Sequence, residues 1–213
     1  SEKSGLAIFK PLQHLEILEA DACRTQGSIG ELAGLSNLRL LSVMRNKVGG
    51  DIDEIFRLTK LTELRIDTNE VTIKRWDHIS KLSRLEIFMA GRNRLNGSLP
   101  SSISALTNLT KLVLDTNKIS GEIPRTLGRL SKLDWLDIDS NAIEGHLSPV
   151  SSLTRLGGLL CAHNRLRGEV RALAPLLNLR RVMIAHNNLS GSLYPWIGNL
   201  THLTRFESVG NSF

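Results

Sequence analysis

The chain has 213 residues, and its 27 lysine and arginine residues exceed its 21 aspartate and glutamate residues, which gives a formal net charge of +6. A hydrophobic fraction of 41% and a charged fraction of 23% argue against bulk disorder, and an aromatic fraction of 4% argues against a core built on large aromatic anchors. No apolar run approaches the ~18 residues of a membrane span, and two cysteines, Cys23 and Cys161, cannot form a multi-bridge scaffold or a four-ligand zinc site.

The sequence is organised as a repeat. Segment 109–124 reads LTKLVLDTNKISGEIP, and its leucine frame returns at Leu15, Leu38, Leu61, Leu85, Leu133, Leu156, Leu179 and Leu203. The polar position of the frame falls on Cys23, Asn46, Asn69, Asn93, Asn117, Asn141, Asn164, Asn187 and Asn211. Successive copies are 23 or 24 residues apart, which is the period of leucine-rich repeats. We expect residues 1–213 to form a single domain of about nine such repeats.

Each repeat is expected to contain a short strand followed by a turn. In TKLVLD (110–115), alternation directs Leu112 and Leu114 inward and Lys111, Val113 and Asp115 outward. Strands of successive repeats would pair in parallel at ~4.8 Å. The asparagine column is interpreted as structural, because a buried amide offers two donors and an acceptor to backbone groups that no strand reaches. An apolar pair spaced i, i+3 then predicts a short helical turn.

The return segments carry a second signature. It is intact as LNGSLP (95–100) and ISGEIP (119–124), and partial as LRGEV (166–170) and LSGSL (189–193). With these motifs the chain, from about Leu12 to Phe213, resembles the plant-type leucine-rich repeat class, best known from receptor-like kinase ectodomains, receptor-like proteins and polygalacturonase-inhibiting proteins. The resemblance implies an α/β solenoid, a right-handed superhelix with a parallel concave β-sheet and short helical or 3-10 turns on the convex side. It also implies binding of proteins, peptides or small ligands on the concave or lateral face.

Three departures from the class pattern matter. The paired cysteines that usually cap plant extracellular members are not present, and Cys23 and Cys161 lie six repeats apart, too far to bridge. The third repeat reads VTIKRW (71–76) in place of Gly-x-Ile-Pro, and the sequence stops inside a repeat. We therefore expect a fragment of a longer protein, or a cap in disordered sequence that follows. The compartment stays open, because missing caps favour a reducing one and sequons at Asn108 and Asn199 allow an extracellular one.

An apolar patch is expected on the outward face of the strands. It would extend over repeats four to eight and consist of Met89, Val113, Trp135, Leu160 and Met183. A contiguous apolar patch rimmed by charge suggests recognition, and tryptophan and methionine are favoured at interfaces.

Two polar groups accompany the patch. An acidic set is formed by Asp67, Asp115, Asp137 and Asp139. We interpret it as a solvated stripe that selects a basic partner, in preference to an acid–base pair. His163 and His186 lie one repeat apart in one column, and because no third ligand accompanies them, surface histidines or a pH-sensitive contact are favoured over a metal site.

The remaining chemistry gives no sign of catalysis. No nucleophile–base pair, phosphate loop or metal cluster occurs at a usable spacing, so no enzyme activity, cofactor or metal is expected. Basic residues such as Arg125 and Arg129 are expected on loops and on the convex side, spread around the solenoid, so no nucleic-acid partner is expected.

The sequence thus predicts a non-enzymatic module that recognises a protein or peptide through its concave face, with no membrane insertion by this segment; it defines no oligomeric state. Two alternatives stay open. The chain could be the substrate-recognition arm of a larger enzyme such as a kinase, a ubiquitin ligase or a secreted effector, or it could be an ectodomain fragment of an extracellular receptor or inhibitor.

Overall fold

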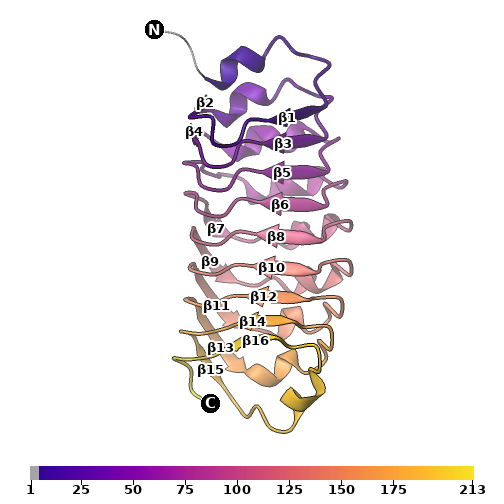
Figure 1. Cartoon of the computed structure of the whole chain (residues 1–213), viewed down its shortest axis with the longest axis vertical. Helices are drawn as coiled ribbons and strands as arrows, with labels where there is room; N and C mark the ends of the chain where they lie inside the picture. The colour runs from indigo at the N-terminus through magenta and orange to yellow at the C-terminus, as the bar shows by residue number, and fades with distance from the viewer. Residues whose placement is uncertain (1–4) are drawn as a thin grey trace.

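Nine short strands stack along one axis to form the main sheet (Figure 1). The computed structural model describes residues 5–213. In order along the sheet the strands are β1 (Ile17–Glu19), β3 (Leu40–Ser42), β5 (Glu63–Arg65), β6 (Ile87–Met89), β8 (Lys111–Val113), β10 (Trp135–Asp137), β12 (Gly158–Leu160), β14 (Arg181–Met183) and β16 (Arg205–Glu207). Every neighbouring pair is parallel, which confirms the predicted α/β solenoid with a parallel sheet.

The core lies directly behind this sheet. The middle residue of a strand points inward, and Leu64, Phe88 and Leu112 have no exposed surface. These side chains join the repeat leucines in one hydrophobic cluster that runs along the solenoid. Since each repeat buries its apolar face only against its neighbours, the outward strand residues are held in a fixed register from repeat to repeat.

The asparagine column forms the predicted ladder. The Asn117 Oδ1 accepts the Leu95 N–H at 2.9 Å, and its Nδ2 donates to the carbonyls of Ala90 and Leu114 at 2.9 and 3.1 Å. The Asn141 side chain makes the corresponding bonds one repeat later. In the first copy the exposed Cys23 donates its thiol to a local carbonyl instead. The column is therefore scaffold, as predicted.

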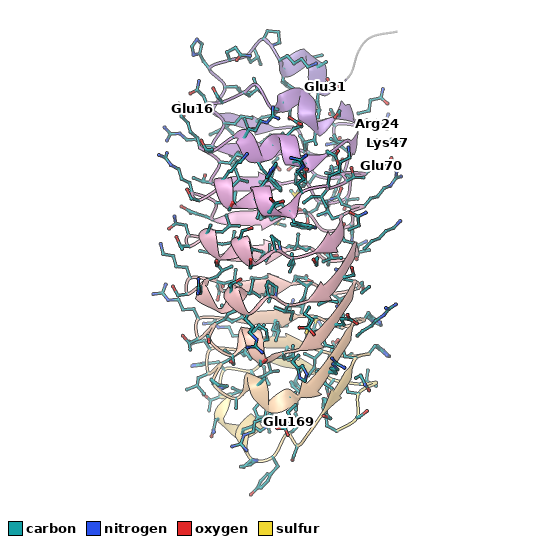
Figure 2. The ribbon with its side chains drawn as sticks, turned by 180° about the vertical axis from the view of Figure 1, so that it is seen from behind. Glu16, Arg24, Glu31, Lys47, Glu70 and Glu169 are labelled. Atoms are coloured by element: carbon teal, nitrogen blue, oxygen red, sulfur yellow. The ribbon has the colours of Figure 1, made fainter. Side chains whose placement is uncertain are left out.

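Short 3-10 helices lie on the opposite side of the solenoid, as Figure 2 shows from behind. They are η1 (Leu6–Phe9), η2 (Ile29–Leu32), η3 (Ile52–Arg57), η4 (Trp76–Lys81), η5 (Ser101–Ala105), η6 (Arg125–Arg129), η7 (Ser148–Val150), η8 (Val170–Leu173) and η9 (Trp196–Asn199). They confirm the predicted helical turns. In the described part of the chain, no helix has the length and apolar character needed to cross a membrane.

A second parallel sheet, which the sequence did not predict, forms in the return segments. Its five strands are β7 (Asn96–Ser98), β9 (Lys118–Glu122), β11 (Ala142–His146), β13 (Arg165–Glu169) and β15 (Asn188–Ser190), and a separate pair is formed by β2 (Gln26–Ser28) and β4 (Lys47–Gly49). The five-stranded sheet and the β2–β4 pair are separated at the divergent segment 71–76. There Trp76 is buried, and its Nε1 donates to the Asn96 carbonyl of the next repeat at 2.6 Å.

Candidate functional site

The outward residues of the nine-stranded sheet form columns across the strands. Met89 pairs with Val113, Val113 with Asp137, Asp137 with Leu160, and Leu160 with Met183. Trp135 lies one column away, between Lys111 and Gly158. The structure thus brings together the residues of the predicted patch, which we call the apolar strip (Met89, Val113, Trp135, Leu160 and Met183).

The apolar strip is less exposed than the sequence predicted. Val113 is buried with 7% of its surface exposed, and Met89, Trp135, Leu160 and Met183 are half-buried. The prediction of an exposed side chain at Val113 is wrong, because this short side chain lies between the longer Met89 and Asp137 of the adjacent strands. The accessible apolar surface therefore divides into two areas, one at Met89 and one formed by Trp135, Leu160 and Met183.

Trp135 extends across its neighbouring strand. Its indole lies over Gly158 of β12, where an added Cβ would overlap the six-membered ring. The Arg181 Cζ of β14 lies 5.7 Å from the ring centroid, and the Lys111 Nζ of β8 lies 5.9 Å from it. Each such cation–π contact contributes about 0.5–1 kcal/mol at an exposed site. The indole thus packs on the Gly158 backbone, and cationic side chains from two other strands contact its ring.

The four predicted aspartates gather near the C-terminal ends of β5 to β10. Here we call Asp67, Asp115, Asp137 and Asp139 the acidic cluster. Gly91 occupies the position between Asp67 and Asp115 in the column of residues that follows the strands, and it has no side chain. The carboxylates of Asp67 and Asp115, from the two neighbouring repeats, therefore occupy the space where a Cβ of residue 91 would lie. The Gly91 N–H donates to the Asp67 Oδ1 at 3.1 Å, and the Arg92 Nε lies 3.9 Å from the Asp115 Oδ2. The cluster is therefore more compact than a stripe with one carboxylate per strand.

Burial and mutual repulsion alter the titration of the acidic cluster. Burial, together with the charge of Asp115, raises the pKa of Asp67 to about 6. Burial, together with the charges of Asp115, Asp139 and Asp67, raises the pKa of Asp137 to about 7. The negative charge of this part of the face therefore grows between about pH 5 and pH 8.

The two histidines are stacked on the surface. The ring centroids of His163 and His186 lie 4.5 Å apart with an interplanar angle of 21°, and both side chains are exposed. Among residues 5–213, no group of three or more histidine, cysteine, aspartate or glutamate side chains is arranged to hold a metal ion. The buried Cys161 and the exposed Cys23 are both free, and burial raises the pKa of the Cys161 thiol.

A basic pocket lies at the opposite ends of the strands, and the sequence reasoning did not identify it. The cavity has a volume of about 700 Å³, and its wall includes Lys132, Asp134, Trp135, Arg155, Arg180 and His202. Trp135 is the first residue of β10, and the other five come from the turns that lead into β10, β12, β14 and β16. These basic residues lie in loops, as expected for basic residues of this chain, but they converge beside the apolar strip and are not spread around the solenoid.

The signal for the pocket was present in the sequence. Apart from Trp135, each lining residue lies either one or three positions before a strand, so stacking of the repeats brings these residues together. The glycine pair at 157 and 158 was a second signal, since glycine inside a strand often marks close approach of another group. The charged positions were missed because they precede the strands, and the glycines were missed because they add no side chain to the outward columns.

Comparison with known proteins identifies the repeat type. The Leucine Rich Repeat family model matches residues 108–130 and 178–200. No curated protein sequence matches the chain. Solved structures share the fold, among them a plant ice-binding protein with 25% identity and a TM-score of 0.85, where the match covers 98% of this chain and 69% of the other.

Two ectodomains of plant receptor kinases are also similar. That of GASSHO1/SCHENGEN3 from Arabidopsis thaliana, solved in complex with CASPARIAN STRIP INTEGRITY FACTOR 2, is 31% identical with a TM-score of 0.83 over 88% of this chain. The Arabidopsis receptor kinase HAESA, solved with the peptide hormone IDA and a co-receptor, is 28% identical with a TM-score of 0.81 over 96% of this chain. The chain spans 23% of the first structure's length and 35% of the second's.

Proposed function

We propose that this leucine-rich repeat solenoid is a non-enzymatic recognition module that binds a protein or peptide through the outer face of its nine-stranded sheet. One observation carries this proposal: Trp135, the acidic cluster and half-buried apolar side chains share a face that no other part of the described chain covers. The similar receptor ectodomains are described as complexes with a peptide hormone or an integrity factor, which supports the same class of ligand.

The chemistry of the face favours a peptide over a small molecule. Interfaces between proteins combine an apolar centre rich in aromatic residues and methionine with a charged rim. Trp135, Leu160 and Met183 supply such a centre, and the acidic cluster supplies one side of the rim. We infer that the apolar residues provide most of the affinity and that the carboxylates select a basic group on the partner and set the association rate.

Two wider readings remain compatible with this role. As the recognition arm of a larger enzyme, the chain would bring a substrate to a catalytic part elsewhere. As part of an extracellular receptor or inhibitor, it would hold its ligand directly. The full-length gene separates them, since a fused catalytic domain supports the first reading and a signal peptide with cysteine caps supports the second.

The proposal can be tested by capturing a partner with the whole chain and then measuring dissociation constants for variants. Trp135→Ala should weaken binding by about 2 kcal/mol or more, which is roughly 30-fold. Asp139→Ala should mainly change the association rate and the salt dependence. The control is Arg125→Ala combined with Arg129→Ala in η6, on the opposite side, and it should bind like the parent. Loss of binding in this control, with Trp135→Ala unaffected, would place the site elsewhere.

A further inference from the structure

The basic pocket carries more positive charge than its own surroundings neutralise. Lys132, Arg155 and Arg180 line the pocket beside a single carboxylate, Asp134. None of these three cations takes part in an ion pair within residues 5–213, whereas the nearby Arg205 is paired with a glutamate in its own strand. Unpaired guanidinium groups that line a cavity favour a ligand with carboxylate or phosphate groups.

The dimensions of the pocket suit an extended chain. A volume of about 700 Å³ is far larger than one inorganic anion requires. The lining residues from Thr110 to His202 come from five successive repeats, so the pocket extends over four strand spacings, roughly 19 Å. At about 3.3 Å per residue, an extended segment of about five or six residues covers this length.

We propose that the basic pocket receives an acidic segment of the partner, with carboxylates facing Arg155 and Arg180 and an apolar side chain resting on Trp135. This inference rests on the proposed function, because it assigns one segment of the same protein or peptide ligand. Trp135 is shared by the pocket and the apolar strip, so a ligand that occupies both surfaces is continuous across the indole. The carboxylates supply specificity through bidentate hydrogen bonds to arginine.

A peptide fits this arrangement better than a nucleic acid does. Single-stranded nucleic acids stack successive bases on several aromatic side chains. Among its lining residues the pocket offers one tryptophan and no phenylalanine or tyrosine, so a second base would find no large aromatic ring to stack on. The surface that continues from it is formed by Leu160 and Met183, which match apolar side chains and not sugars or phosphates.

The two charged areas also define an orientation. The acidic cluster lies near the C-terminal ends of β5 to β10, and the basic pocket lies at the N-terminal ends of β10 to β16. A ligand with an acidic segment and a basic segment separated by apolar residues would be complementary to both areas at once. The reverse placement would put like charges together at both ends of the ligand.

The experiment uses short labelled peptides as probes. The acidic probe is Glu-Leu-Glu-Leu-Glu, and its matched controls replace every glutamate with glutamine or with lysine. Binding to the whole chain is measured by fluorescence anisotropy at low and at physiological salt. The indole fluorescence of Trp135 gives a second readout, since Trp76 and Trp196 are buried and bonded through their Nε1 atoms. An oligothymidylate and a polygalacturonate oligomer of similar charge test the other classes of polyanion.

Two charge-reversal variants locate the interaction. Arg155→Glu with Arg180→Glu changes the pocket, and Arg125→Glu with Arg129→Glu makes the same change of net charge on η6. We expect the acidic probe to bind about tenfold more tightly than its glutamine control, the pocket variant to lose about tenfold in affinity, and the η6 variant to change by less than about twofold. Thermal unfolding verifies that both variants fold, and Arg155→Gln with Arg180→Gln repeats the test without introducing negative charge.

Three results with the probes would overturn the inference, and a fourth concerns a captured partner. The first is equal weakening by the pocket and η6 variants, which would indicate attraction by net charge alone. The second is equal affinity for the glutamate and glutamine probes. The third is tighter, pocket-dependent binding of oligothymidylate or polygalacturonate. If a captured partner is weakened by Trp135→Ala but is insensitive to the pocket variant, the acidic-segment inference fails and the proposed function stands.

Discussion

Replacing Asn117 with leucine tests the asparagine ladder at a single step. The change keeps the branched shape and the number of side-chain heavy atoms, and it removes one acceptor and the amide donors. The Leu95 N–H loses its only partner in the ladder, the Asn117 Oδ1 at 2.9 Å, and Leu95 has no exposed surface through which water could replace that oxygen. A buried donor left unpaired costs about 1–3 kcal/mol.

The carbonyl acceptors of Asn117 are affected much less. Each carbonyl keeps another donor. The Ala90 carbonyl still accepts from the Asn93 Nδ2, and the Leu114 carbonyl still accepts from the Asn141 Nδ2. The Asp115 carbonyl still accepts from the Arg92 N–H. The expected loss in the free energy of unfolding is therefore that of one orphaned amide, about 2 kcal/mol. A larger value, near the sum of every bond removed, is not expected.

Urea unfolding followed by far-UV circular dichroism measures this loss, with Asn211→Leu as the matched control. Asn211 accepts the Leu189 N–H at 3.0 Å, so the local chemistry is the same. Its copy is the last one in the chain, and such a repeat can open without unfolding the rest, so its midpoint should shift much less. Equal shifts at the two positions, or a loss below about 0.5 kcal/mol at Asn117, would refute the reasoning.

Three further outcomes are expected. Burial and neighbouring carboxylates raise the pKa of Asp137 to about 7, so the folded state retains a proton that the unfolded chain releases, and stability falls as pH rises from about 4 to about 7. In urea unfolding near pH 8, the free energy of unfolding of Asp137→Asn should therefore exceed that of the parent by about 1 kcal/mol, after allowance for the partial exposure of the carboxyl. Below pH 4 the two proteins should be equally stable. Gly158→Ala should displace the Trp135 indole, shift its fluorescence and weaken partner binding, with a stability change below about 1.5 kcal/mol. The chain alone should show no hydrolase, transferase or nucleotide-dependent turnover, and robust activity abolished by replacing Asp115 and Asp139 together would contradict its role as a binding module.

The repeat made the scaffold predictable from the sequence. A fixed period of 23 or 24 residues places every strand, because the same leucine positions must face the same core in each copy. The asparagine ladder followed from the need to pair buried backbone groups at the turn. The second sheet was missed, because the pairing of β7 with β9 depends on backbone alignment between return segments and not on alternating side chains.

The binding face was only partly predictable for a different reason. Columns of outward residues follow from the register, but the conformation of a side chain within a column does not. The Trp135 indole crosses to Gly158, the Asp67 and Asp115 carboxylates close over Gly91, and Val113 is covered by its neighbours. These contacts arise between repeats, so a list of positions along one repeat cannot show them.

Contact between the partner and the sheet face is the central claim, and site-specific photo-cross-linking tests it most directly. A photoreactive amino acid is placed at Met183 in one variant and at Arg129 in another, and each is irradiated with the captured partner. Met183 lies on the outward face of β14, and Arg129 lies in η6 on the opposite side. The account predicts a covalent adduct from position 183 and none from position 129. An adduct from position 129 with none from position 183 would contradict it.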